Sequence, residues 1–267
     1  MKGFLTVAEE AARAAGAILR DNIHGKREIT YKGDINLVTE MDRLSERTVV
    51  KTLLASFPGH GIMAEEETMI QNDSGYMWII DPLDGTTNYA HGYPCFSVSI
   101  ALEHEGEIVV GVVYDPMRDE LFSALKGAGA CLNNTTIHVS TVDTLIKSLL
   151  STGFPYDRKV SEKNNLDYFH DLLMAAQEVR RDGSAALDLC YVASGRFDGF
   201  WELKLKPWDV AAGSLIVREA GGVISDFSGT RFSILDDEIL ATNGRIHPHM
   251  LETLRKSVKK TSCGLHR

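Results

Sequence analysis

The chain opens with two stretches in which apolar residues recur every three or four positions, the spacing of one face of an α-helix. The first stretch has its apolar positions at Phe4, Val7, Ala11, Ala14, Ala15, Ile18 and Leu19. It predicts an amphipathic helix that ends near Asp21 or Asn22. The second predicted helix begins after Thr39, a good N-cap residue, and ends at Pro58-Gly59. Its inward positions are Leu44, Val49, Leu53 and Leu54.

Shorter apolar runs in the middle of the chain predict β-strands. Residues 77–80 form an apolar run that is closed by Asp81-Pro82, so this strand should deliver Asp81 to the edge of a sheet. Three further runs, at 96–102, 108–114 and 120–125, are rich in β-forming residues and are separated by short polar turns. They predict an antiparallel meander.

Helical and strand patterns alternate in the second half. Helices are expected at 162–177, 184–194, 209–220 and from near Pro248, and strands at 200–205 and 223–226. No linker rich in Pro, Gly or Ser interrupts the chain, and no internal repeat is present. We therefore expect one domain over residues 1–258 with two packed halves, about 1–140 and about 145–258. The remaining residues, 259–267, are expected to be a disordered tail.

Composition narrows the class of protein. A chain of 267 residues with 44% hydrophobic residues can bury a full core, and no apolar run is long enough to predict a membrane span. The first residues lack the apolar core of a secretory signal, so we expect a cytoplasmic protein. A net charge of -9 argues against nucleic acid or an anionic membrane as the main partner, because both need clustered Lys and Arg. An acidic protein can still bind an anion when divalent cations lie between them.

The cysteines suggest no metal site of their own. Cys95, Cys131, Cys190 and Cys263 are far apart and form no CxxC pair. Small reduced core residues are a better explanation than zinc ligands.

The richest chemical signal is the run Asp81-Pro82-Leu83-Asp84-Gly85-Thr86-Thr87-Asn88. Two carboxylates follow a strand directly, and a Gly-Thr pair after them can open a helix. Free N–H groups at a helix start bind phosphate oxygens, while carboxylates hold the hard cation that neutralises the remaining charge. Gly85 would let the backbone approach closely. Taken alone, ordinary turn chemistry explains the same residues.

Two further acidic features occur elsewhere in the chain. Glu65-Glu66-Glu67 follows a short apolar segment, and Asp209 follows Trp208. In isolation, a solvated acidic turn and a helix N-cap are the better explanations for these features. Together with the 81–88 run, however, the three motifs occur in an order that makes them informative as a set.

This set of motifs resembles the inositol monophosphatase family, within the wider lithium-sensitive phosphatases that include fructose-1,6-bisphosphatases. The resemblance is carried by Ala64-Glu65-Glu66, by the 81–88 run and by Trp208-Asp209, and segments 32–42 and 181–189 resemble further parts of the family. It extends from about the first helix to Gly222. Ala64 stands where the family usually has Gly, and an Ala there requires a negative φ.

The resemblance implies a fold and a metal site. The fold would be a layered α/β (α+β) sandwich of alternating helix pairs and sheets, with the site between the two halves, in a homodimer. A first Mg²⁺ would be held by Glu65, Asp81 and the backbone carbonyl of Leu83. Asp81 would bridge to a second Mg²⁺ that Asp84 and Asp209 complete, and a third, weaker ion would use Glu65 with water.

The resemblance also implies a reaction. Thr86, hydrogen-bonded to Asp42, would orient a metal-bound water that attacks phosphorus in line, without a covalent intermediate. Residues implied in substrate binding are Lys32, Gly85, Thr86, Gly183, Ser184, Ala185 and Glu202. Glu202 would accept hydrogen bonds from the hydroxyls of inositol monophosphate, unless it is merely the outward residue of a strand. Lithium would inhibit by taking the second metal position.

Several alternatives stay open. In phosphatases of the haloacid dehalogenase type, the first of two strand-end Asp residues is the nucleophile. In this chain Asp81 and Asp84 are one residue further apart than those two acids, and Pro82 misaligns them. A regulatory binding protein with a vestigial site is a non-enzymatic alternative. The substrate could also be fructose-1,6-bisphosphate or another sugar phosphate, histidinol phosphate or a nucleotide 3′-phosphate.

Overall fold

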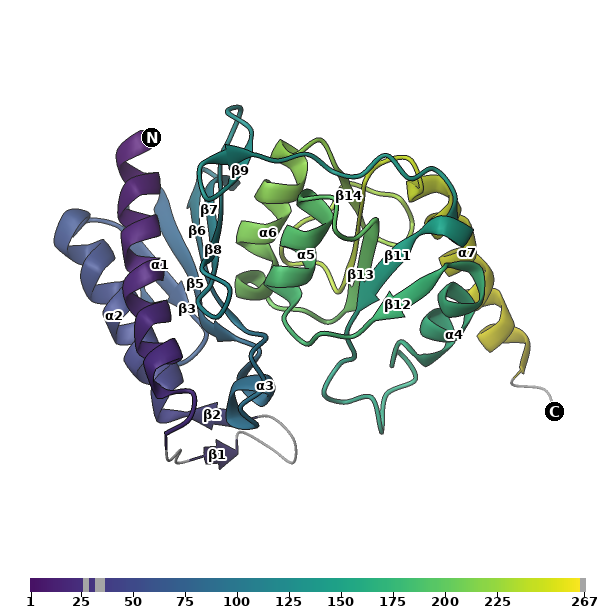
Figure 1. Ribbon diagram of the computed structural model, residues 1–267, viewed down its shortest axis with the longest axis horizontal. Coiled ribbons are helices and arrows are strands. Elements are labelled where there is room, and N and C mark those ends of the chain that lie inside the picture. The colour runs from purple at the N-terminus through teal and green to yellow at the C-terminus, as the bar shows by residue number, and fades with distance from the viewer. Residues whose placement is uncertain (26–28, 32–36, 265–267) are drawn as a thin grey trace.

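Pairs of helices alternate with two large sheets along the long axis of the molecule (Figure 1). The computed structural model describes residues 1–25, 29–31 and 37–264. Helices α1 (Lys2–Asn22) and α2 (Glu40–Ser56) cover the outer face of an eight-stranded sheet. Helices α5 (Ala185–Ala193) and α6 (Pro207–Glu219) lie between this sheet and a five-stranded one. Helices α4 (Leu166–Ala175) and α7 (His247–Gly264) cover the far side. The expected layered sandwich is thereby confirmed.

Small residues bring α1 close to its sheet. The buried face of the helix consists of Ala8, Ala11, Ala12, Ala15, Gly16 and Leu19. A Cβ on Gly16 would lie 2.5 Å from the ring of Tyr114, so only glycine permits this approach. The expected first helix is confirmed, and α2 ends before Pro58-Gly59 as expected.

The eight-stranded sheet carries the strand that ends in the acidic run. Its order is β10-β9-β8-β7-β6-β5-β3-β4. The strands are β3 (Gly61–Ala64), β4 (Met69–Ile70), β5 (Tyr76–Asp84), β6 (Ser97–His104), β7 (Glu107–Asp115), β8 (Glu120–Leu125), β9 (Ala130–Leu132) and β10 (Thr135–Thr136). The expected meander is confirmed, because β6, β7 and β8 pair antiparallel in sequence order.

The five-stranded sheet has the order β12-β11-β13-β15-β14. Its strands are β11 (Leu149–Thr152), β12 (Glu178–Arg180), β13 (Gly199–Leu203), β14 (Val223–Ser225) and β15 (Glu238–Thr242). The remaining elements are the antiparallel pair β1 (Ile29–Tyr31) and β2 (Leu37–Thr39), helix α3 (Thr86–Ala90) and the short 3-10 helix Leu145–Lys147.

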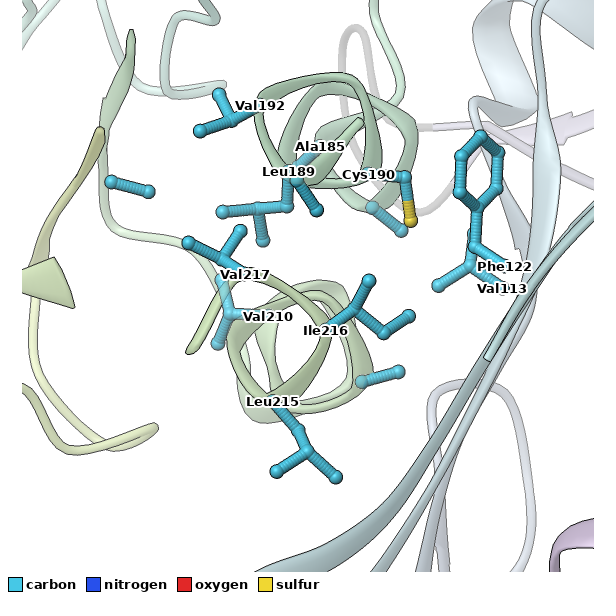
Figure 2. Close-up of a cluster of buried hydrophobic side chains, with 14 of the residues drawn as sticks. Val113, Phe122, Ala185, Leu189, Cys190, Val192, Val210, Leu215, Ile216 and Val217 are labelled. Atoms are coloured by element: carbon cyan, nitrogen blue, oxygen red, sulfur yellow. The ribbon is translucent and has the colours of Figure 1, made fainter. Parts of the chain in front are cut away.

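Helix α5 is buried along its whole length and α6 is buried from Val210 to Val217. Figure 2 shows Leu189 and Cys190 of α5 and Val210, Leu215 and Ile216 of α6 in one apolar cluster. A helix with apolar residues on most of its faces has to lie inside a protein, which explains why α5 and α6 separate the two sheets. Packing between these layers joins the two halves of the chain.

Three helix boundaries differ from the expected ones. Helix α4 begins at Leu166 rather than near residue 162, because Asn165 has φ 73, a left-handed conformation that a right-handed helix cannot include. Helix α6 begins at Pro207 rather than Asp209, since proline suits the first turn of a helix. Helix α7 continues to Gly264, through much of the stretch expected to be a disordered tail; no proline or glycine precedes Gly264 in that stretch.

No helix in the part of the chain described here is long and apolar enough to cross a membrane.

Candidate active site

The acidic run lies where β5 loses its regular pairing. Asp81 pairs with Ser99 and Asp84 pairs with Ser97, so Pro82 and Leu83 bulge between them. The N–H of Leu83 donates to Asp81 Oδ1 at 2.9 Å. A bulge is one of the few places where a sheet strand tolerates proline, which has no N–H to donate. The two carboxylates are therefore presented from an irregular strand end, and their residues are only 1% and 9% exposed.

Gly85 turns the chain from this strand into α3. Its φ is 100, a left-handed value, and a Cβ there would lie 3.0 Å from the carbonyl oxygen of Cys95 and 3.2 Å from the Cα of Phe96. Both facts require glycine. The expected helix start after the acidic run is confirmed, with Gly85 at the N-cap of α3.

Thr86 links the acidic run to α2. Its Oγ1 lies 3.1 Å from Asp42 Oδ1 and also 3.1 Å from the carbonyl oxygen of Leu83. A hydroxyl has one proton, so Thr86 donates to one of these acceptors at a time. Asp42 is fully buried. The expected Asp42–Thr86 pair is thus present.

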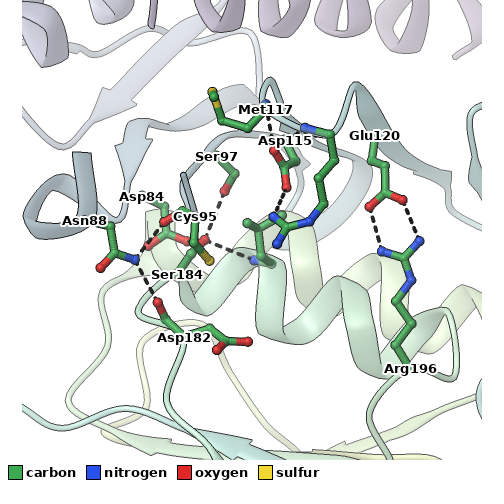
Figure 3. Close-up of polar contacts among 12 residues, drawn as sticks. Asp84, Asn88, Cys95, Ser97, Asp115, Met117, Glu120, Asp182, Ser184 and Arg196 are labelled. Carbon is green, nitrogen blue, oxygen red and sulfur yellow. Dashed lines mark hydrogen bonds and ion pairs between the residues drawn. The ribbon is translucent and has the colours of Figure 1, made fainter. Parts of the chain in front are cut away.

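Asp84 is held by the start of α5, as Figure 3 shows. Ser184 Oγ donates to Asp84 Oδ2 at 2.6 Å, and the N–H of Ala186 donates to the same oxygen at 2.8 Å. Ser184 is also the N-cap of α5. Nearby, Asn88 Nδ2 donates to the carbonyl of Asp182 at 2.7 Å. A carboxylate at a helix N-terminus is stabilised by the free N–H groups there, so α5 orients Asp84.

Asp209 is the third residue of α6 rather than its N-cap. Lys206 is the N-cap, and its N–H donates to Asp209 Oδ2 at 2.7 Å. The N–H of Asp209 in turn donates to the backbone carbonyl of Lys206 at 3.1 Å, so only the side-chain half that Asp209 supplies resembles a capping box. One oxygen of the Asp209 carboxylate therefore accepts a hydrogen bond from the backbone. Asp209 also lines the cavity described next.

These elements surround a cavity of about 530 Å³ that both halves of the chain line. Glu65, from the turn after β3, reaches the same space. The predicted site residues that line it are Glu65, Asp81, Leu83, Asp84, Gly85, Thr86, Gly183, Ser184, Ala185, Glu202 and Asp209. Asp42 does not line the cavity, but it contacts Thr86, which does. Lys32 lies outside the described residues.

Burial makes the carboxylates of this cavity hard to ionise. Loss of water, followed by the charges of Glu65, Asp84 and Asp209, raises the pKa of Asp81 well above its usual value. Burial raises the pKa of Asp84 to about 6 and that of Asp209 to about 7. Burial also raises the pKa of Glu202 to about 8. A cation among these groups would favour their charged forms.

The donor set fits a hard divalent cation, because carboxylate and carbonyl oxygens are the ligands that Mg²⁺ prefers. Within the described part of the chain, however, no three His, Cys, Asp or Glu side chains are already gathered closely enough to hold a metal ion.

Two expectations about single residues can be compared with the structure. Ala64 is not among the described non-glycine residues with positive φ, so the condition for an Ala at that position is met. Glu202 is only 9% exposed and lines the cavity, so it is not a solvated outward residue of its strand.

Sequence reasoning missed several polar residues that share the cavity. They are Tyr156, Asp157, Arg181, Asp188, Lys204 and Lys206. Arg181 and Asp188 fall within the 181–189 segment singled out above, although no role was assigned to them. The signal available for Tyr156 was the run Gly153-Phe154-Pro155-Tyr156 between a strand and a helix. Such a run predicts a loop but not which way the loop faces.

Comparison with known proteins agrees with this arrangement. A family model described as the inositol monophosphatase family matches residues 1–259. The inositol-1-monophosphatase of Synechocystis sp. is 47% identical over 257 residues, which cover 95% of this chain and 89% of that protein. The Nus factor SuhB of Escherichia coli is 43% identical over 258 residues, covering 96% and 97%.

Solved structures place the chain in the same group. The structure of inositol monophosphatase from Anabaena superposes with a TM-score of 0.88 at 47% identity, and the match covers 96% of each chain. Fold, motifs and relatives thus agree over nearly the whole length, and this protein belongs to the inositol monophosphatase family.

Proposed function

We propose that this protein is a magnesium-dependent phosphatase of small phosphate monoesters, with inositol monophosphate as its substrate. The observation that carries the proposal is that Glu65, Asp81, Asp84 and Asp209, from three separate motifs, line one cavity beside the Asp42–Thr86 pair. A substrate phosphate could not approach four such acids without cations between them.

Each motif has its own part in the proposed metal site. Glu65, Asp81 and the carbonyl of Leu83 would hold a first Mg²⁺, Asp81, Asp84 and Asp209 would hold a second, and Glu65 would also serve a third, weaker ion. When bound, the metal supplies an acidified water as nucleophile and neutralises charge on the phosphate and the leaving oxygen.

The protein's own groups would position the reactants. Thr86 would accept a hydrogen bond from the attacking water while its hydroxyl donates to Asp42 Oδ1, 3.1 Å away, which would keep the hydroxyl oriented. The N–H groups of Gly85 and Thr86 would donate to phosphate oxygens. Gly183, Ser184 and Ala185 would line the pocket for the alcohol part of the ester, and Glu202 would accept its hydroxyls. No step requires a covalent bond between enzyme and phosphate.

A panel of phosphate esters tests this function. Purified protein should release phosphate from inositol monophosphate in Mg²⁺ and release none after chelation. Fructose-1,6-bisphosphate, other sugar phosphates, histidinol phosphate and a nucleotide 3′-phosphate should be slower substrates. Labelled water should place its oxygen in the phosphate, and acid quenching should trap no aspartyl phosphate. A chelator-resistant activity, or a trapped aspartyl phosphate, contradicts the proposed mechanism.

A second candidate is a regulatory binding role. It is favoured by the relative named Nus factor SuhB at 43% identity over nearly the whole chain. A regulatory role that depends only on the surface would persist in a variant without phosphatase activity, such as Asp81→Asn. We also propose that the protein forms a homodimer, which light scattering of the purified protein can check.

A further inference from the structure

One wall of the cavity comes from the chain between β11 and α4. Gly153, Phe154, Pro155, Tyr156 and Asp157 follow each other in sequence, and all five line the space that the carboxylates line. None of them belongs to the acidic motifs. Contacts from other elements hold both ends of this loop in place.

The first end of this wall is held through its backbone. The side-chain amide of Asn165 donates to the carbonyl of Gly153 at 2.6 Å. A Cβ on Gly153 would collide with the carboxylate of Glu202, so the chain passes directly against that side chain. Phe154 packs against Phe169 of α4, with ring centroids 5.5 Å apart.

The second end is held by one lysine. Lys204 Nζ donates to Asp157 Oδ2 at 2.6 Å and to Ser161 Oγ at 2.7 Å. Lys204 follows β13 and has φ 61, a left-handed value that is uncommon for a residue with a side chain. Its N–H donates to the carbonyl of Asp237 at 2.7 Å, which fixes this conformation. Lys204 therefore clamps the loop on the far side of Tyr156.

Tyr156 lies between the two anchors of this loop. The residue is 56% exposed, and no described residue accepts a hydrogen bond from it. Although the residue as a whole is exposed, partial burial of the phenol in the cavity, followed by the charges of Glu65, Asp84 and Asp209, raises the pKa of Tyr156 to about 12. The hydroxyl thus keeps its proton at neutral pH, and it stands near the acids that would hold the metals.

We propose that Tyr156 is a substrate-binding residue whose phenol O–H donates a hydrogen bond to the phosphate group of the bound ester, and that Lys204 is the positioning residue that holds it there. Phosphate oxygens only accept hydrogen bonds, and the carboxylates around them only accept as well once ionised. A neutral phenol supplies a donor at this place. The inference rests on the proposed function for the identity of the ligand.

Tyr156→Phe removes the hydroxyl and keeps the ring. Inorganic phosphate should bind this variant about 10-fold more weakly in calorimetric titrations in Mg²⁺, the order of effect expected for a hydrogen bond to a charged group. The KM for inositol monophosphate should rise by a similar factor. The matched control is Tyr93→Phe, because Tyr93 is 52% exposed and does not line the cavity. It should behave as wild type.

Lys204→Met tests the clamp, because it removes the ammonium and keeps most of the stem. It should also weaken phosphate binding. If Lys204 acts through Tyr156, the double variant should lose no more affinity than the Tyr156→Phe variant alone, whereas independent effects would multiply. Lys126→Met is the control, since Lys126 makes an exposed ion pair with Glu107 at 3.7 Å, away from the cavity.

Wild-type affinity in Tyr156→Phe overturns the proposal, even when the enzyme hydrolyses esters as expected. So does wild-type protein that binds no phosphate in Mg²⁺. Absence of hydrolysis for every ester would contradict the proposed function instead, and the phosphate titration would still decide the role of Tyr156. If the losses of phosphate affinity caused by the two single substitutions multiply in the double variant, Lys204 does not act through Tyr156, and its positioning role is overturned.

Discussion

Asp84 and Ser184 are 100 residues apart in sequence and share a hydrogen bond of 2.6 Å. The bond joins the end of β5 to the N-cap of α5, so it connects the two halves of the chain inside the cavity. It also commits one oxygen of a proposed metal ligand to a fixed direction. The position of α5 and the geometry of the metal site are therefore coupled.

Ser184→Ala should weaken this coupling. The variant loses the hydrogen bond to Asp84 and the N-cap of α5, which together should lower the free energy of unfolding by about 1–3 kcal/mol. The concentration of Mg²⁺ for half-maximal activity should rise as well. Denaturant unfolding and a magnesium titration measure the two effects.

Ser97→Ala is the matched control for that variant. Ser97 is as deeply buried as Ser184 and is the strand partner of Asp84, but its hydroxyl pairs with that of Ser184 at 3.3 Å rather than with the Asp84 carboxylate. Its removal should leave the magnesium requirement unchanged. Equal magnesium requirements in both variants would contradict the role assigned to Ser184.

Asp81→Asn should stabilise the metal-free protein while it lowers the enzymatic activity. The pKa of Asp81 is raised well above its usual value by burial and neighbouring acids, so its charged form opposes folding when no metal is bound. The neutral amide should raise the melting temperature of metal-free protein at pH 8. Loss of the bridging carboxylate should lower kcat by several orders of magnitude, as removal of a central charge-stabilising group does. Near-normal turnover would contradict the proposed metal site.

Stability without metal should fall as the pH rises from about 4 to about 7. An unfolded Asp loses its proton near pH 3.8, whereas the folded pKa is about 6 for Asp84 and about 7 for Asp209. Between these values the folded state binds more protons than the unfolded state, so each increase in pH favours unfolding. Mg²⁺ binds the deprotonated acids and should offset this loss.

Melting curves at pH 5 and pH 8, each with and without Mg²⁺, check that linkage. The shift in melting temperature caused by Mg²⁺ should be larger at pH 8. Taking the difference at each pH cancels the titration of groups outside the site. A larger shift at pH 5 would show that the metal does not bind through these carboxylates.

How far the sequence alone leads can be judged from particular residues. The strand before Asp81 and the helix start after Gly85 were predictable, because local pattern and turn chemistry determine both. The start of α4 was not, since the left-handed Asn165 is held by its tertiary contacts: its side chain bonds to Gly153 and to the indole N–H of Trp201. Short strands such as β4 and β12 have too few residues to show the alternation of apolar and polar positions that predicts a strand.

The missed wall of the cavity has the same physical cause. Tyr156 sits in a loop, and its direction depends on Lys204, which comes 48 positions later and reaches back to the neighbouring Asp157. No pattern along the chain reports such a contact. The acidic motifs could be grouped only by resemblance to a family, because each of them has an ordinary structural explanation by itself.

Lithium should inhibit hydrolysis uncompetitively with respect to the ester. Under the proposed site it would occupy the position of the second metal after hydrolysis, when phosphate is still bound, so added substrate would not displace it. Inhibition should weaken in Asp209→Asn, assayed on whatever rate remains. Initial rates over a grid of lithium and ester concentrations decide the type of inhibition, and strict competition would contradict this placement.

Glu202→Gln should change the choice of substrate. The Glu202 carboxylate lines the cavity beside Gly153, is only 9% exposed and comes from β13 rather than from the acidic motifs. Above pH 8, where the buried Glu202 carboxyl is ionised, hydrogen bonds from substrate hydroxyls to this charged acceptor contribute about 1.5–3 kcal/mol each, so the KM for inositol monophosphate measured at about pH 9 should rise about 10-fold or more in the variant. β-Glycerophosphate has no polyol ring for Glu202 to bind, so its KM should change little. Steady-state kinetics with both esters provide the comparison, and equal effects on the two, or none on either, would show that Glu202 does not recognise the polyol.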